Sequence, residues 1–314
     1  MEGKFTATVV RSTGSWYEVR TEDGRNAGGG VIVRARIRGK LRLGGSRSTN
    51  PVVVGDRVRC GGEEGEMWIE EILPRRNYII RRSSNLSKES HVIAANIDQA
   101  VVVATLFAPE TSMEFIDRFL VTCEAYQIPA TILLNKIDLA AQAPEAVEHF
   151  TEVYRLAGYP VMHASAETGQ GVDRFREYLR GRTTLVSGNS GVGKSTLIKA
   201  VEPALDIRIG EISKAHRKGM HTTTFSQVYP LSFGGYIIDT PGIKGFGLID
   251  INPEELYHYF PDLMRVAGDC QYYNCTHTHE PGCAVVAAVE SGDISEDRYI
   301  SYLKMLEDDE KYRK

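Results

Sequence analysis

The chain has 314 residues, which leaves room for two or three domains of roughly 100–200 residues each. A hydrophobic content of 42% and a charged content of 25% are those of an ordinary globular protein, and the net charge of −4 excludes nucleic-acid binding through bulk positive charge. No apolar run approaches the ~20 residues that span a membrane, and the N-terminus lacks the apolar core of a signal peptide. We therefore expect a cytoplasmic protein without a membrane partner, and we expect a monomer.

Short β-like segments follow one another from Phe5 to about Leu73. Five such segments separated by turn residues predict a small closed or nearly closed barrel. In the third segment, residues 31–43, apolar and basic residues alternate, and a period of two places the basic ones on one outer face. The basic residues are Arg34, Arg36, Arg38, Lys40 and Arg42.

Two interpretations of this basic row stay open. A solvated strand face would explain it, and so would a surface that follows the backbone of an oligonucleotide. The second is favoured because no acidic residue lies between Gly24 and Val54. Aromatic partners for bases are few, with Trp16, Tyr17 and Trp68 the only candidates, so the pattern indicates backbone contacts more than base recognition.

Residues 74–90 are polar and basic and predict a connector. Beyond them, strand patterns alternate with helix patterns, which predicts a parallel α/β sheet. The expected strands are residues 97–106, 129–136, 159–165 and 183–188, and the expected helices are residues 113–127, 143–158, 171–181 and 194–201. After Gly247 the chain becomes helical, at residues 252–268, 283–292 and 295–314. This tail is too short and acidic for a large core of its own.

The stretch GNSGVGKS fits the phosphate-binding pattern G-x-x-x-x-G-K-[S/T], and it lies between a predicted strand and a predicted helix. In such a loop the backbone N–H groups face the phosphates, Lys194 reaches the outer phosphates, and the Ser195 hydroxyl binds Mg²⁺. The sequence therefore predicts a nucleoside triphosphate site. Its expected residues are Gly188, Asn189, Ser190, Gly191, Val192, Gly193, Lys194, Ser195 and Thr196.

The tetrapeptide Asn135-Lys136-Ile137-Asp138 follows a predicted buried strand. The Asp138 carboxylate can accept both the ring N–H and the exocyclic amine of guanine, a donor pair that adenine lacks on that edge. Asn135 would address the other edge of the base and tie this segment to the phosphate loop. Alone the tetrapeptide is also a plain strand-end turn, but beside a phosphate loop it predicts GTP. Ser165-Ala166, after the next strand, is expected to offer backbone amides to the guanine oxygen.

The stretch YIIDTPG places Asp239 at a strand end, where it can hold Mg²⁺ through water, and Gly242 where its amide can meet the γ-phosphate. The residue after this motif is Ile243, where many GTPases carry a glutamine that orients water. An isoleucine cannot orient water, so unaided turnover should be slow. His221 is the nearest candidate in sequence, and we hypothesise that it enters the site when its loop closes.

The loop that holds His221, residues 214–225, contains three consecutive threonines. Such a loop orders when a threonine binds Mg²⁺ and the γ-phosphate, although ordinary loop polarity explains its composition as well. Thr223 is the candidate among residues 222–224, and the sequence does not decide between them.

Cys270, Cys275, His277 and Cys283 occur in the pattern C-x₄-C-x-H-x₅-C. Three thiolates and an imidazole predict a closed tetrahedral zinc site of the structural kind. The odd count of five cysteines and this tight cluster favour a reduced compartment over disulfides. His279 is a competing ligand, because Cys-x-His and Cys-x₃-His spacings can both reach a metal.

With these motifs in place, the chain resembles the circularly permuted GTPases called RsgA or YjeQ, which depend on the small ribosomal subunit. The resemblance rests on VVVGDRV, IAANIDQAVVV, NKIDL, GNSGVGKSTL, HTTT, DTPGIKGFGL and CQYYNCTHTHEPGC. It implies an OB-fold domain that binds rRNA (1–75), a linker (76–90), a permuted GTPase domain (91–249) and a zinc domain (250–314). The resemblance also favours His277 over His279 as the ligand, and the permutation explains why the base-reading tetrapeptide precedes the phosphate loop.

The resemblance further implies GTP hydrolysis late in assembly of the small subunit, stimulated by that subunit, with GTP or GDP and rRNA as partners and Mg²⁺ and zinc as cofactors. Two other classes stay open. A P-loop kinase or ATPase acting on a small molecule is disfavoured by Asn135 and Asp138, and a structural RNA-binding protein with a vestigial site is disfavoured by the intact Lys194, Ser195 and Asp239.

Overall fold

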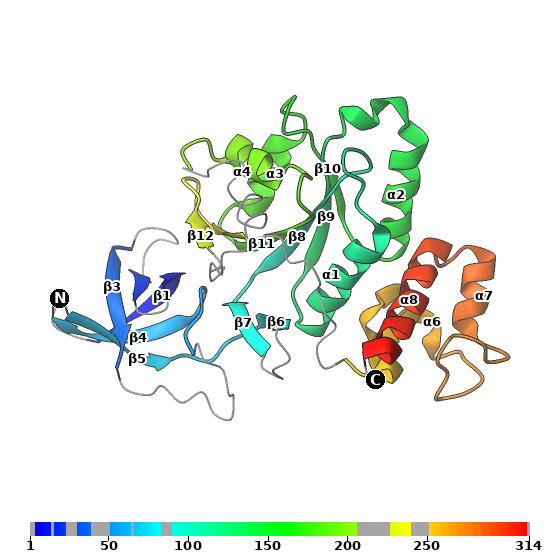
Figure 1. Cartoon of the computed structure of the whole chain (residues 1–314), viewed down its shortest axis with the longest axis horizontal. Coiled ribbons are helices and arrows are strands. Elements are labelled where there is room, and N and C mark those ends of the chain that lie inside the picture. The colour runs from blue at the N-terminus through cyan, green and yellow to red at the C-terminus, as the bar shows by residue number, and fades with distance from the viewer. Residues whose placement is uncertain are drawn as a thin grey trace.

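The computed structural model describes residues 4–13, 16–22, 30–38, 51–63, 66–82, 90–205, 227–239 and 251–312. These residues form three parts in chain order: a β-barrel, a central mixed sheet covered by helices, and a helical C-terminal part. Figure 1 shows the barrel and the C-terminal helices on opposite sides of the central sheet. The three-part architecture expected from the sequence is confirmed.

Five strands close the N-terminal barrel, in the order β1-β2-β3-β5-β4. Alternate residues point inward, so that Val19 and Ala35 are buried while their neighbours Arg34 and Arg36 on β3 are exposed. Tyr17 also points inward and is buried in the barrel core. The strands are β1 (Phe5–Ser12), β2 (Tyr17–Thr21), β3 (Ile32–Ile37), β4 (Arg57–Glu63) and β5 (Glu66–Ile72).

The segment expected as a connector contains regular structure. Strand β6 (Tyr78–Arg82) pairs antiparallel with β7 (Ser90–Ala95) in a separate two-stranded sheet. Ile79 on β6 is fully buried and joins the core of the central part. The residues before β6 are therefore the join between the barrel and the central part, and β6 itself belongs with the latter.

Six strands form the central sheet in the order β10-β9-β8-β11-β13-β12. Neighbouring strands are parallel, as the alternating pattern predicts, except that β12 runs antiparallel to β13 at one edge. The carboxyl ends of β9, β10, β11 and β13 thus meet along one edge of the sheet. The strands are β8 (Gln99–Ala104), β9 (Ala130–Leu134), β10 (Val161–His163), β11 (Thr183–Ser187), β12 (Gln227–Pro230) and β13 (Tyr236–Asp239).

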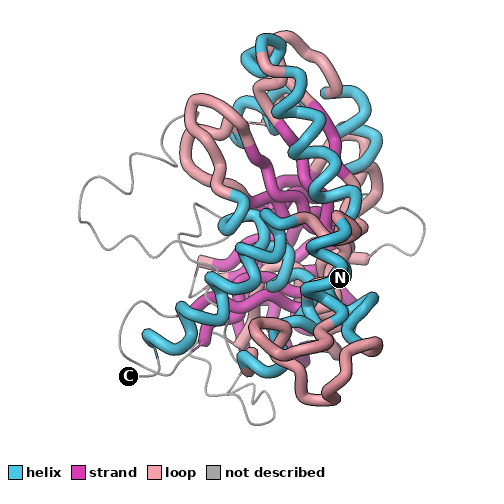
Figure 2. Tube along the Cα trace, turned by 90° about the vertical axis from the view of Figure 1, so that its right-hand side faces the viewer, coloured by secondary structure: helices cyan, strands magenta, loops and turns pink. Residues whose placement is uncertain are grey.

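Helices cover both faces of this sheet: in Figure 1, α3 and α4 lie on one side of the strands and α1 and α2 on the other, and Figure 2 looks onto the side of α1 and α2. Apolar residues of α1 and α2 pack on one face, and apolar residues of α3 and α4 pack on the other. The arrangement buries the continuous apolar runs of the inner strands on both sides, as parallel sheets require. The bounds are α1 (Met113–Ala125), η1 (Leu139–Gln142), α2 (Pro144–Leu156), α3 (Val172–Leu179) and α4 (Lys194–Val201).

The C-terminal part consists of η2 (Pro253–Tyr259), α6 (Pro261–Ala267), α7 (Ala284–Ser291) and α8 (Glu296–Tyr312). The single helix expected over 252–268 is wrong: it is broken at Phe260, which is extended because Pro261 follows it. The core of this part includes Val121 of α1, so its apolar side chains pack against the central part. Within the described residues, no helix is both long and apolar enough to cross a membrane.

Candidate nucleotide-binding and metal-binding sites

The predicted phosphate loop, residues 188–193, joins the end of β11 to the start of α4. Two of its glycines are required by close contacts. Gly188 has φ of +147°, and a Cβ there would lie 2.4 Å from the Val103 carbonyl oxygen. Gly193 has φ of +90°, and a Cβ would lie 2.6 Å from the Asn135 side-chain nitrogen. A side chain at either position would strain the backbone and displace its neighbour, so glycine lets the loop lie close to β8 and to the residue that follows β9.

Lys194 is the first residue of α4, and its ammonium folds back over the loop. It donates hydrogen bonds to the backbone carbonyls of Gly188 and Asn189, the latter at 2.9 Å. Val192 is buried in the core between the sheet and α4, which anchors the middle of the loop. Ser195 and Thr196 follow in the first turn of α4, and Ser190 and Gly191 lie in the loop itself. The positive charge and the helix N-terminus therefore face the same place, which suits an anion.

The segment predicted to read the base, residues 135–138, is linked to this loop by two side chains. The Asn135 amide donates to the Val192 carbonyl at 2.8 Å, and its oxygen accepts from the Ala166 backbone N–H at 3.3 Å. The Lys136 ammonium donates to the Gly191 carbonyl at 2.8 Å. Asn135 is 2% exposed, so its bonds are formed away from water and fix the segment firmly.

Asp138 lies at the carboxyl end of β9, beside the turn that follows β10. Its Oδ1 is buried and has no hydrogen-bond partner within the described part of the chain. The backbone of Ile137 binds Ala164, and the Ser165 hydroxyl accepts from the Thr168 N–H at 3.1 Å, so the two turns are held side by side. An orphaned carboxylate oxygen next to backbone amides fits the donor and acceptor edge of guanine.

One loop that the sequence did not single out also lies against the predicted nucleotide site. Residues 105–111 follow β8, and the Ala108 carbonyl accepts a second hydrogen bond from Lys136. The Pro109 ring lies 3.2 Å from the place where a Cβ on Gly191 would be. Hydrophobic periodicity carries no signal for such a loop, since its contacts are made by a backbone carbonyl and a proline ring with segments that are distant in the sequence.

Asp239 ends β13, directly beside β11, with its Cα paired to that of Val186. Its backbone therefore lies next to the start of the phosphate loop. The other predicted residues of this group, His221, Thr223 and Gly242, lie outside the described residues.

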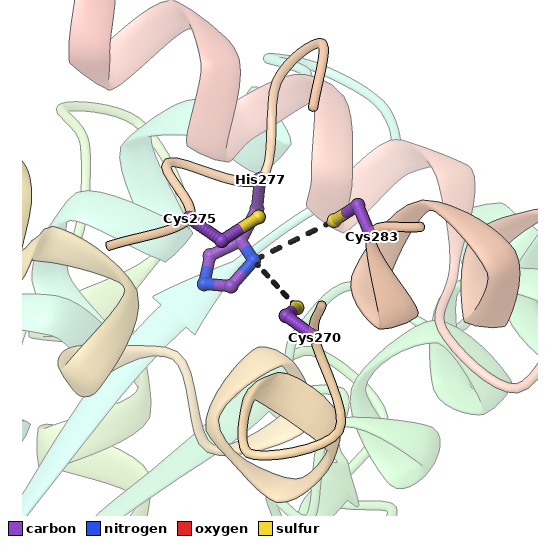
Figure 3. Close-up of side chains that lie close together, drawn as sticks. All are labelled: Cys270, Cys275, His277 and Cys283. Carbon is purple, nitrogen blue, oxygen red and sulfur yellow. Dashed lines mark hydrogen bonds between the residues drawn. The ribbon is translucent and has the colours of Figure 1, made fainter. Parts of the chain in front are cut away.

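The four predicted metal ligands come together in the C-terminal part, with their ligand atoms all within 4.8 Å of one another. The His277 Nδ1 lies 3.5 Å from the Cys270 sulfur and 3.6 Å from the Cys283 sulfur, as Figure 3 shows. Tetrahedral zinc with ligand bonds of ~2.0–2.3 Å requires neighbouring ligand atoms roughly 3.5–3.8 Å apart. The donor set and its spacing therefore fit a four-coordinate metal held through Nδ1.

Neighbouring groups hold these ligands in place. The Tyr299 and Tyr302 hydroxyls of α8 donate to the carbonyls of His277 and Thr276, at 2.9 and 2.7 Å. Burial raises the pKa of Cys275 to about 12, so its thiolate is stable only beside a cation. His279, the competing ligand, is exposed, and its ring bonds Thr278 instead. The geometry thus selects His277.

A buried ion network connects the metal-binding part to the central part. Arg298 of α8 lies between Asp117 of α1, at 2.5 Å, and Asp262 of α6, at 3.1 Å. All three side chains are withdrawn from solvent, and burial raises the pKa of Asp117 although the guanidinium opposes that rise. The guanidinium also lies over the Phe260 ring, 4.5 Å from its centroid. No sequence motif indicates this contact.

Comparisons with known proteins agree with this arrangement. A family model described as RsgA GTPase matches residues 72–249, and one described as RsgA N-terminal domain matches residues 6–67. A relative from Bacteroides fragilis named small ribosomal subunit biogenesis GTPase RsgA is 55% identical over 309 residues, which cover 97% of this chain and 98% of the relative. A relative of the same name from Porphyromonas gingivalis is 51% identical, with 97% and 98% covered.

Two solved structures are also similar along nearly their whole length. YjeQ from Thermotoga maritima is 35% identical with a TM-score of 0.79, and the match covers 98% of both chains. YloQ, described as a circularly permuted GTPase, is 28% identical with a TM-score of 0.76, covering 99% of this chain and 96% of its own. The strand that carries the predicted base-reading tetrapeptide precedes the predicted phosphate loop here, and the family model spans both, so the chain belongs to the RsgA family of GTPases.

Proposed function

We propose that this chain hydrolyses GTP in the late maturation of the small ribosomal subunit, in the cytoplasm, and that binding to the subunit accelerates the hydrolysis. The observation that carries the proposal is the interlocked site: Asn135 and Lys136 bind the phosphate loop, while the Asp138 oxygen is left for a base. The ribosomal partner is inferred from the relatives, which are named small ribosomal subunit biogenesis GTPases.

Each residue of the site has a proposed task. The Asp138 carboxylate and the Ser165-Ala166 turn bind guanine, and Lys194 stabilises the charge that develops on the transferred phosphoryl group. Ser195, Asp239 and a threonine of residues 222–224 would hold Mg²⁺, which neutralises phosphate charge when bound. A residue brought in by the loop or by the subunit would position the attacking water, with His221 the candidate in this chain.

We further propose that the metal of the cysteine cluster is zinc with a structural role. Four protein ligands leave no open position for water or substrate, and the donors are the three sulfurs and one nitrogen that zinc favours. We also propose the division into an OB-fold domain (1–75), a GTPase domain (91–249) and a zinc domain (250–314), which follows the three parts of the structure. Residues 76–90 are proposed as the linker between the first two, with β6 inside this segment packed on the central part through Ile79.

The test is GTP turnover by the full chain with and without purified small subunits. We expect slow turnover alone and strong stimulation by the subunits, with ATP a poor substrate. A Lys194→Ala variant serves as the control for contaminating nucleotidases, because it lacks the ammonium that faces the phosphates. Turnover that the subunits leave unchanged would overturn the ribosomal part of the proposal, and equal turnover of ATP would overturn the assignment of the base.

A further inference from the structure

The outer face of the barrel carries an arrangement of aromatic and basic side chains that no motif reveals. The guanidinium of Arg36 on β3 lies over the indole ring of Trp16, 3.9 Å from the ring centroid. On the other side of β3, Arg36 is paired with Trp68 of β5. Since paired residues of neighbouring strands share a face, Arg36 and Trp68 lie side by side on β3 and β5, and Trp16, the residue just before β2, extends this row through its contact with Arg36.

This row is accessible. Trp16 is 38% exposed, Arg36 is exposed and Trp68 is partly exposed, while Met67 and Ile69 on either side of Trp68 are buried in the barrel. On β4 the residue paired with Trp68 is Gly61, which has no side chain to cover the indole. The indole of Trp68 is thereby left partly exposed, and the side chain nearest to Gly61 is the Glu70 carboxylate of β5.

The charge of this face is positive and only partly neutralised. Within the described part of the chain, Arg34 and Arg36 form no ion pair, whereas Arg38 lies 3.7 Å from Glu70. Glu18 is paired with Arg34 across β2 and β3, but its carboxylate lies 3.8 Å from Arg11. The face therefore combines aromatic rings with arginines that form no ion pair to any described residue.

We propose that Trp16, Arg36 and Trp68 form a stacking site for an unpaired RNA base. A guanidinium plane has two faces; Trp16 covers one face of Arg36, and the second is suited to stack on a nucleobase, as arginine planes and aromatic rings do in single-stranded RNA recognition. Arg34 supplies charge for the adjacent phosphate. The inference deepens the proposed function, on which it rests for the presence of rRNA, and it changes the expectation from the sequence, since the barrel would contact bases as well as backbone.

The chain provides its own reporter for this site. It contains only two tryptophans, Trp16 and Trp68, and both belong to the row. A base that stacks there should quench the intrinsic tryptophan fluorescence of the full chain. We expect single-stranded oligoadenylate to quench it and heparin, a polyanion without bases, to leave it nearly unchanged while competing for the cations.

Variants separate stacking from charge. Trp16→Ala should weaken oligoadenylate affinity by roughly 5- to 100-fold, since base stacking on one aromatic ring contributes on that order. Arg36→Lys keeps the charge but loses the plane, and should reduce the affinity nearly as much as Arg36→Ala. The matched control is Arg59→Ala, which removes an exposed barrel arginine that pairs with Glu71 at 2.5 Å. It should change the affinity less than about twofold.

The outcomes are distinct. The proposal is overturned if oligoadenylate binds without quenching, or if Trp16→Ala behaves like Arg59→Ala while circular dichroism shows both to be folded. It is also overturned if Trp16→Ala weakens binding to small subunits but no RNA quenches the fluorescence, because the face would then contact a protein. If subunits fail to stimulate GTP turnover of the unaltered chain, the proposed function is wrong, whereas the quenching by oligoadenylate still decides the stacking site.

Discussion

Replacing Arg298 with methionine tests whether the C-terminal part is held to α1 by charge. Methionine keeps an unbranched stem beside Phe260 but leaves the carboxylates of Asp117 and Asp262 buried without a cation. Removing one partner of a buried ion pair typically costs about 3–5 kcal/mol, because the remaining charge stays desolvated. We expect the free energy of unfolding at neutral pH to fall by that amount.

The loss should depend on pH. Burial already raises the pKa of Asp117 while Arg298 opposes the rise, so removing the guanidinium raises it further. A carboxyl whose folded pKa lies above its unfolded value is most stabilising below the unfolded pKa, and stability is lost as the pH rises through the folded pKa. The deficit of Arg298→Met relative to the unaltered chain should therefore be largest at neutral pH and shrink towards acid.

The assay is denaturant unfolding followed by circular dichroism at neutral and mildly acidic pH. Arg155→Met is the matched control, since Arg155 forms a 2.5 Å pair with Glu152 but is 65% exposed, and it should leave the unfolding midpoint unchanged. A triple variant, Asp117→Leu, Asp262→Leu and Arg298→Met, should recover much of the loss. A loss below ~1 kcal/mol for Arg298→Met, or a triple variant as unstable as the single one, would refute the reasoning.

Three further predictions concern the two sites. Asp138→Asn replaces two acceptor oxygens by one acceptor oxygen and one donor NH₂ group. It should weaken GTP binding roughly 10- to 100-fold in a fluorescent-nucleotide titration. An unchanged affinity would show that this residue does not bind the base. Gly193→Ala and Gly158→Ala impose similar backbone strain, at φ of +90° and +89°, but only the first meets a neighbour, so only the first should lose GTP affinity. His277→Ala should lower the zinc content and the melting temperature of the purified chain, whereas His279→Ala should change neither; the reverse result would move the ligand.

Much of the fold could be predicted because its periodic segments are long. The runs that became β8 and β9 are apolar throughout and buried on both faces, and α1 and α2 show helical spacing over more than three turns. Strand β6 was missed because its apolar residues number only three between arginines, and β12 was missed because it is short and ends in Pro230. The break at Pro261 could have been foreseen, since the residue before a proline avoids helical angles.

The two sites could also be predicted only in part. Residues of the phosphate loop and the metal cluster lie close together in the sequence, so their spacing alone predicts their chemistry. The bonds between Asn135 and Val192, and between Arg298 and Asp117, join residues 57 and 181 positions apart, and nothing local encodes them. The row of Trp16, Arg36 and Trp68 likewise depends on strand register, which a sequence pattern leaves undetermined.

Helix α8 has a consequence for how far the parts of this chain can be separated. Its Arg298 neutralises an aspartate of α1, and its two tyrosines brace the metal loop, while Val121 of α1 completes the C-terminal core. A truncated protein ending at residue 249 would expose Val121 and leave Asp117 without its cation. The boundary at residue 249 is therefore unsuitable for truncation. Moving the nucleotide-binding part into another protein would require either that α8 be included or that the surface of α1 be redesigned.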